Sequence, residues 1–290
     1  MNNIALFKNS IALLDEVYKN AALTADLDGA PELVKAGANA NELIIPMIDM
    51  QGLGDYDRNS GYVNGDVTLT NETVKCNFDR GRMFNVDAMD NEESAGVAFG
   101  RLSGEFIRTK VVPELDAFRF ATYASADGVT VANAALKAAD PATVIAKIVE
   151  GVTAMDEAEV PFEGRILYIT PTLKNIADNA ETTKSKAIFE RFEKIVLVPQ
   201  TRFYSSIDLY DGKTGGKENG GYVKAADGKD INFMIVHKGA PIQFQKHTVP
   251  KIVTPEANQT SDGWKFGYRT VGIADVYENK TAGIYVNLAE

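Results

Sequence analysis

A short run of glycine, lysine and threonine is the first candidate for chemistry. Gly212-Lys213-Thr214 has the residue order that ends a phosphate-binding loop, in which backbone N–H groups and a lysine hold the phosphates of a nucleotide. That motif requires another glycine five residues before Gly212, and the chain has Ile207 there. The surrounding residues also lack the strand-to-helix pattern that such a loop joins. The sequence therefore favours a flexible surface loop over a nucleotide site.

An acidic, turn-rich stretch is the second candidate. Asp55, Asp57, Asn59 and Asp66 would place oxygen ligands at the first, third, fifth and twelfth positions of a calcium loop. However, Ser60 stands where the sharp-turn glycine belongs, Asp66 replaces the bidentate glutamate, and no helices are predicted on either side. Asp, Asn and Gly are also the ordinary residues of turns. We therefore expect a turn and no metal site.

Other catalytic patterns are incomplete. The two histidines, His237 and His247, and the one cysteine, Cys76, do not have the spacing of a zinc site. Ser103 comes one position too late for a nucleophile elbow. Carboxylates are abundant, but no spacing marks an acid–base pair of the glycosidase type. We predict no catalytic residue, no metal and no cofactor, and hence a protein that is not an enzyme.

Charge and composition exclude several classes of protein. The 290-residue chain has 30 Lys and Arg against 40 Asp and Glu, a net charge of −10, so it lacks the basic surface of a protein that grips nucleic acid. No apolar run approaches the length of a membrane span, and we expect no membrane association. A single cysteine is consistent with a reducing cytoplasm, and the N-terminus shows no secretion signal.

The elements that must position any site begin with an amphipathic helix. Apolar residues recur at spacings of three and four between residues 3 and 20, which predicts a helix with one apolar face. Such a helix would dock on its own core or lie on a neighbouring subunit, and the pattern favours neither. The residues of this stripe are Ile4, Phe7, Ile11, Leu14 and Tyr18.

A long extended hairpin is predicted next, with residues 43–50 and 62–87 as its two sides and a tip rich in Gly and Asp. This segment has little apolar material to bury against its own domain, and a long polar excursion is uncommon unless it is functional. We expect another chain to cover it. Aromatic and arginine side chains dominate interfaces, so Tyr56, Arg58 and Tyr62 are the candidate subunit contacts.

The rest of the chain predicts a long helix followed by a mixed α/β core. Helical periodicity continues to Tyr123, with Pro113 inside it, so we expect a kink or break there. Asp140-Pro141 and Thr170-Pro171 each have the form of a helix start. A further short helix is expected at 186–192 and an exposed loop at 210–230. Strands are predicted at 165–169, 195–198, 231–236, 242–244, 264–274 and 284–288.

In this order of elements the chain resembles the tailed-phage major capsid proteins of the Hong Kong 97 type. The resemblance covers nearly the whole chain and depends on order and coverage, because no single stretch is diagnostic. The stretches that carry it are DRGRMFNVDAMDNEES, GEFIRTKVVPELDAFRFATYA, RILYITPTLKNIAD, INFMIVHKGAPIQFQKHTVPKI and YRTVGIADVYENKTAGIYV.

The resemblance implies an α+β phage capsid fold with a defined division of the chain. It implies an N-terminal arm, an extended β-hairpin loop, a long spine helix at 92–124, an axial domain with a mixed sheet and helices, and a strand-rich peripheral domain that includes the spine. The corresponding ranges are 1–40 for the arm, 41–88 for the extended loop, 140–241 for the axial domain, and 89–139 with 242–290 for the peripheral domain.

The resemblance also implies a function. The chain would form pentamers and hexamers that close into the icosahedral head shell of a virion around phage DNA, without binding that DNA specifically. Assembly would take place in the bacterial host cytoplasm, with a portal and a separate scaffolding protein as further partners. The net negative charge fits an inner wall that does not adsorb DNA.

Three alternatives remain open from the sequence: an encapsulin-type bacterial nanocompartment shell, a carbohydrate-acting enzyme, and a monomeric binding module. One departure from the resemblance is specific. Some relatives join subunits covalently through a lysine on the extended loop, and residues 41–74 contain no lysine. We therefore expect no such bond.

Overall fold

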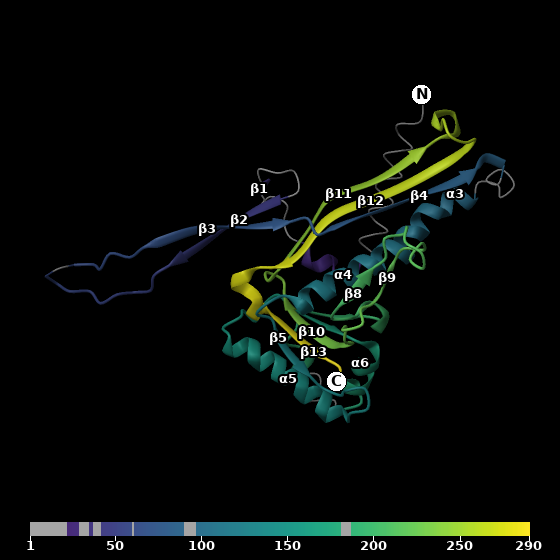
Figure 1. Cartoon of the computed structure of the whole chain (residues 1–290). Coiled ribbons are helices and arrows are strands. Elements are labelled where there is room, and N and C mark those ends of the chain that lie inside the picture. The colour runs from purple at the N-terminus through teal and green to yellow at the C-terminus, as the bar shows by residue number, and fades with distance from the viewer. Residues whose placement is uncertain (1–21, 29–34, 37–41, 60, 90–96, 181–186) are drawn as a thin grey trace.

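A computed structural model describes residues 22–28, 35–36, 42–59, 61–89, 97–180 and 187–290 of the chain (Figure 1). The predicted helix at 3–20 and the first residues of the predicted spine helix lie outside the described residues. Within them the protein combines long helices with four sheets, which is the α+β organisation that the sequence predicts. No helix in these ranges is long and apolar enough to cross a membrane.

The spine consists of two α-helices joined by a π-helical turn. Helix α3 covers Val97–Phe106, the π-helical turn η3 covers Ile107–Val111, and α4 covers Val112–Ser125. Pro113 lacks an N–H, and its ring would clash with the carbonyl four residues earlier in a regular helix. The wider turn directly before it relieves that clash. The break expected at Pro113 is therefore a π-helical turn, and the chain continues in one direction through it (Figure 1).

A five-stranded sheet forms the largest core. Its order is β5-β13-β10-β6-β7, with parallel pairs at the two edges and antiparallel pairs in the middle. Both faces are covered, so its central strands are buried along almost their whole length without alternation. The strands are β5 (Thr130–Asn133), β6 (Arg165–Ile169), β7 (Lys194–Leu197), β10 (Ile231–His237) and β13 (Ile284–Leu288).

Helices on the two faces of this sheet bury opposite sides of the same strands. Ile166 and Tyr168 of β6 share a buried cluster with Phe120 of α4, whereas Leu167 and Ile169 share one with α5. Helix α5 (Pro141–Glu157) starts as the sequence predicts, because the Asp140 carboxylate accepts the Thr143 N–H at 2.7 Å. Helix α6 (Pro171–Asp178) packs beside α5, with Leu173 and Ala177 in the same cluster. The predicted helix at 186–192 lies partly outside the described residues, and Ala187–Phe189 are helical.

A second sheet is long and three-stranded, in the order β11-β12-β4 (Figure 1). All its pairs are antiparallel. Strand β4 packs its aromatic residues under the spine, where the rings of Phe84 and Phe106 are 4.8 Å apart and those of Phe78 and Phe118 are 4.9 Å apart. The strands are β11 (Pro241–Val253), β12 (Gly263–Val276) and β4 (Phe78–Asp87).

These sheets correct two expectations from the sequence. The predicted hairpin side at 62–87 is split: β3 (Val67–Lys75) belongs to the hairpin, whereas β4 pairs with β12. The physical reason is that Phe78 and Phe84 have apolar partners in the body of the protein. The C-terminal strand β13 was expected in the peripheral domain, but it lies in the five-stranded sheet between β5 and β10. The division into domains as a whole remains a prediction.

Candidate assembly surface

The hairpin of β2 (Glu42–Met50) and β3 is the most prominent feature of the molecule (Figure 1). Its register runs from Glu42 opposite Lys75 to Met50 opposite Val67. Nine antiparallel residue pairs at ~3.4 Å per residue give a ladder about 30 Å long before the tip begins. The short strand β1 (Lys35–Ala36) pairs with the body end of β2. The hairpin therefore extends well beyond its own globule, as Figure 1 shows.

Short-range contacts give the tip a defined shape. The backbones of Asp57 and Gly61 exchange two hydrogen bonds of 3.3 and 2.8 Å, and the Asn59 N–H donates to the Asp57 carboxylate at 2.7 Å. Gly61 has φ of +77°, a backbone conformation that favours glycine. The Tyr56 and Tyr62 rings, one on each side of this turn, are tilted against each other with centroids 4.8 Å apart. The tip is thus a small ordered structure built on two tyrosines.

Apolar side chains are exposed along the whole outer part of the hairpin. Every described residue from Met50 to Thr70 except Gly61 is exposed, and Tyr62 keeps 87% of its surface accessible. Such clustering of exposed apolar residues marks an interaction surface. The large apolar residues involved are Met50, Leu53, Tyr56, Tyr62, Val63, Val67 and Leu69.

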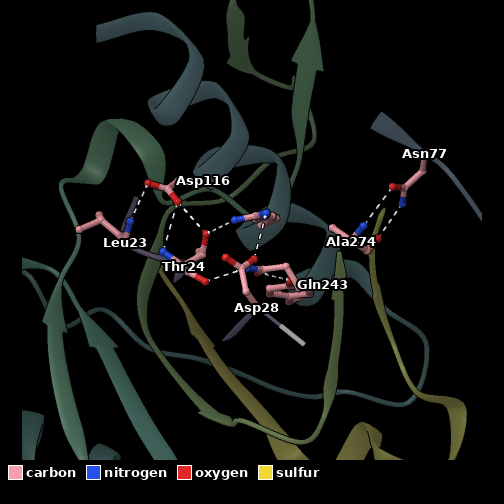
Figure 2. A network of polar contacts seen from close by, with 9 residues as sticks. Leu23, Thr24, Asp28, Asn77, Asp116, Gln243 and Ala274 are labelled. Carbon is pink, nitrogen blue, oxygen red and sulfur yellow. Dashed lines mark hydrogen bonds and ion pairs between the residues drawn. The ribbon is translucent and has the colours of Figure 1, made fainter. Parts of the chain in front are cut away.

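The base of the hairpin is fixed to the body by one apolar and one polar contact. Val74 is buried in a cluster with Ile242 and Ile273 of the three-stranded sheet. Next to it, the Asn77 amide donates to the Ala274 carbonyl at 2.6 Å and accepts the Ala274 N–H at 3.1 Å (Figure 2). The side chain of Asn77 thereby takes the place of a strand backbone between β3 and β4. These contacts determine where the hairpin leaves the sheet.

The structure brings two of the three predicted contact residues together. Tyr56 and Tyr62 touch across the tip, and Arg58 is exposed on the turn between them. Arg58 forms no ion pair with any residue in the described part of the chain. The hairpin tip therefore presents two aromatic rings and one guanidinium to the outside. Whether these residues contact a second subunit remains a prediction.

The other sequence candidates lie apart from one another. Ser103 is inside helix α3. The backbone of His247 is in β11, and the His237 Nδ1 accepts the Gly239 N–H at 3.1 Å. No group of three or more His, Cys, Asp or Glu among the described residues could hold a metal ion. The candidate calcium loop is thus, in its described part, the hairpin tip.

The Gly212-Lys213-Thr214 run lies in the loop between β8 (Ile207–Leu209) and β9 (Tyr222–Lys224), as expected for a surface loop. The Asp211 carboxylate accepts the backbone N–H groups of Lys213 and Thr214, each at 3.0 Å. Together with the Thr214 hydroxyl, these donors lower the pKa of Asp211. Those N–H groups therefore hold a turn and do not point at an open phosphate site.

A groove of about 1710 Å³ separates β4, the spine and the β8–β9 loop. Two arginines of β4 contact the loop: Arg82 donates to the carbonyls of Asn219 and Glu218 at 2.9 and 3.2 Å, and Arg80 donates to the Gly221 carbonyl at 3.4 Å. Arg80 also pairs with the Glu114 carboxylate of the spine at 2.7 Å. Each described carboxylate that lines the groove is held by a cation or by its own turn. They are Asp79 with Arg269, Glu105 with Arg108, Glu114 with Arg80, and Asp211.

Sequence reasoning missed the residues that fix these surfaces. The stretch DRGR contains Arg80 and Arg82, and Asn77 lies two residues before it. Charged residues inside a predicted strand were the available sign that these side chains have specific partners. Asp116 and Arg119 are both almost fully buried on α4. The sequence pattern that could have identified them is a pair of opposite charges three residues apart on an apolar helix face.

Comparison with known proteins gives the fold. The structure of Mycobacterium phage Che8 matches with a TM-score of 0.61 and 15% identity over 91% of this chain and 89% of that chain. A crystal structure of a virus-like particle from Pyrococcus furiosus matches with a TM-score of 0.60 and 12% identity over 95% and 96%. The capsid of Myoviridae phage XM1 matches with a TM-score of 0.56 and 10% identity over 89% of each chain.

These matches extend along almost the entire chain, so they concern the whole architecture. No protein-family model and no curated protein sequence matches the chain. At identities of 10 to 15% the likeness establishes the fold. The capsid fold predicted from the order of the elements is therefore confirmed.

Proposed function

We propose that this chain is a major capsid protein, which assembles into pentamers and hexamers and closes into the icosahedral head shell of a tailed bacteriophage. The projecting hairpin is the observation that carries the proposal. The hairpin is about 30 Å long and exposes apolar and aromatic residues. In a monomer these residues stay in contact with water and do not stabilise the protein, whereas a neighbouring copy would bury them. The shared fold with phage capsids supports the same conclusion.

Under this proposal the protein's partners are other copies of itself. Phage DNA would lie inside the shell without specific binding, in keeping with the net charge of −10. A portal and a separate scaffolding protein are further proposed partners, with assembly in the host cytoplasm and the virion as the final location. The engaged carboxylates of the groove favour a non-enzymatic role, because none of them forms an opposed, unpaired acid–base couple among the residues described.

A nanocompartment shell is the second candidate, because the same fold is found in a virus-like particle from Pyrococcus furiosus as well as in phage capsids. The two functions share the assembly and differ in the contents of the shell. Nucleic acid in particles purified from the native source would indicate a phage head, and a protein cargo would indicate a compartment.

Electron microscopy with light scattering tests the proposal directly. The purified full-length protein should form closed, uniform shells or ring-shaped pentamers and hexamers at high concentration. Co-expression with a candidate scaffolding protein should increase the proportion of correct shells. A protein that stays monomeric under both conditions would refute the proposed function.

A further inference from the structure

Residues 22–28 lie across α4 and β11 as a short strap, held on one side by a single buried carboxylate (Figure 2). The backbone N–H groups of Leu23 and Thr24 donate to Asp116 at 3.1 and 3.3 Å, and the Thr24 hydroxyl donates to the same carboxylate at 2.8 Å. Asp116 is 1% exposed. One side chain of the spine therefore receives three hydrogen bonds from the strap.

The strap is held from the opposite side by Gln243 of β11 (Figure 2). The Gln243 amide donates to the Thr24 carbonyl at 2.7 Å and to the Asp28 carboxylate at 2.6 Å, while its oxygen accepts the Tyr123 hydroxyl at 2.7 Å. Arg119 of α4 completes the set, since it donates to the Thr24 hydroxyl at 2.8 Å and lies 3.5 Å from Asp28. Thr24 and Asp28 are thus each tied both to α4 and to β11.

The docked strap adds a carboxylate to a site that contains two arginines. Arg119 and Arg202 both face Asp116, and the Asp28 carboxylate provides the second negative charge. Docking brings the Asp28 carboxylate beside Arg119, which is 1% exposed. A buried charge is strongly unfavourable unless it is compensated, so the negative charge of Asp28 stabilises the docked strap.

The strap also supports the charge of Asp116 itself. Burial raises the pKa of this carboxyl above its usual value, and the hydrogen bonds from Leu23 and Thr24, together with the two arginines, offset part of that rise. At the outer edge, Lys194 of β7 pairs with Asp26. Tyr168 of β6 faces the same region, and burial raises its pKa, so it stays neutral there.

Apolar burial contributes less to the attachment than these polar contacts. Leu27 is the only apolar side chain of the strap in the core, where it joins Phe120 and Tyr123, while Leu23 packs at the margin. One leucine gives limited hydrophobic gain, and ordering seven residues has a large entropic cost. The polar network therefore decides whether the strap is docked.

We propose that the strap is a separately opening element, which docks and undocks as a unit while the five-stranded and three-stranded sheets remain folded. Asp28 and Thr24 control this equilibrium through Arg119 and Asp116. In the docked state the strap holds Ala22 against the cluster under the spine, and undocking would remove that contact. The inference goes beyond shell formation and does not depend on it.

Hydrogen exchange of the full-length protein, read by mass spectrometry on peptides that cover the strap, tests the proposal. Two variants remove one contact each with little change of shape: Asp28→Asn removes the balancing charge, and Thr24→Val removes the hydroxyl between Arg119 and Asp116. We expect strap amides to exchange at least tenfold faster in both variants, with β10 unchanged. Asp127→Asn, which removes an exposed carboxylate after α4, is the matched control and should exchange as the wild type does.

Two outcomes would overturn the proposal. One is an unchanged strap exchange rate in both variants, which would show that these contacts do not control docking. The other is an equal acceleration of the strap and β10, which would show that the strap opens only when the whole protein unfolds. All variants are compared in the assembly state in which the wild type is purified.

Discussion

The side-chain amide of Asn77 forms two hydrogen bonds with the backbone of Ala274, at 2.6 and 3.1 Å, and so continues the pairing of β12 by one residue beyond β4. The pair lies where the chain passes from the hairpin into the three-stranded sheet (Figure 2). A side chain in place of a strand backbone lets the hairpin change direction without leaving the β12 groups unpaired. The orientation of the hairpin therefore depends on this pair.

Replacing Asn77 by alanine should loosen the base of the hairpin. Loss of two partly buried hydrogen bonds is expected to lower the free energy of unfolding by about 1–2 kcal/mol, measured by urea denaturation. Limited proteolysis should also cut between residues 75 and 78 faster than in the wild type. Asn64→Ala, which removes an exposed amide in the tip, is the control. Equal stability of the two variants would contradict the assigned role.

The hairpin tip should matter for assembly and not for folding. Tyr62→Ala and Arg58→Ala change exposed side chains, so circular dichroism and the urea midpoint should stay within about 0.5 kcal/mol of the wild type. The yield of shells or capsomers in electron microscopy should fall strongly, because aromatic and arginine residues dominate interface energies. Phe162→Ala removes an exposed aromatic ring elsewhere and should assemble normally. Full yield from both tip variants would refute their assignment as subunit contacts.

Acid should destabilise the protein in part through His237. Burial lowers the pKa of this imidazole, and the positive charges of Arg165 and Lys280 lower it further, against a hydrogen bond with the Glu163 backbone. A histidine with a lowered pKa in the folded state contributes stability above the unfolded value of about 6.5, and this is lost as the pH falls toward the folded pKa.

The urea midpoint of the wild type should therefore fall between pH 7.5 and pH 5.5, and His237→Gln should show a smaller fall. His247 is present in both proteins, so its contribution cancels in the comparison. An identical fall in wild type and variant would show that His237 does not contribute.

Arg165 should be essential for the loop between α5 and β6. Its guanidinium is buried and donates to the carbonyls of Pro161 and Val160 at 2.9 and 2.6 Å and to the Asp156 carboxylate at 2.6 Å. Arg165→Met removes all three bonds and should cost about 3 kcal/mol in the free energy of unfolding. Arg108→Met, at an exposed ion pair with Glu105, is the control and should cost less than about 1 kcal/mol. Similar losses in both would contradict this account.

Assembled particles should contain no covalent bond through a lysine of residues 41–74, because this stretch includes none. Boiling purified particles in detergent should give a single monomer band on a denaturing gel. A ladder of higher bands that survives reducing agent would show a cross-link through other residues.

The sequence predicted the bounds of an element best where residues within or directly beside that element determine them. Helix α5 begins at Asp140-Pro141, as predicted, because the cap and the proline act within a single turn. Strand β6 was predicted at its observed bounds, because its apolar run has turn residues at both ends. Both elements are specified by local chemistry.

The end of the hairpin was predicted wrongly, because β3 and β4 are both extended and only two residues separate them. The pairing partner of β4 is β12, almost 200 residues further on, and no local pattern encodes that choice. The ties between Thr24 and Asp116 likewise join distant segments. Long-range partners thus account for what the sequence left undetermined.

The π-helical turn at Ile107–Val111 has a consequence for the direction of side chains along the spine. A turn that holds one extra residue offsets every later side chain by about 100° relative to an unbroken α-helix. Phe106, before the turn, and Phe118, after it, both face aromatic residues of the three-stranded sheet, whereas Phe120 contacts Tyr168 of the five-stranded sheet. The extra residue therefore keeps one side of the continuous rod in phase with the three-stranded sheet before and after the turn, and leaves another azimuth of the same rod for the five-stranded sheet.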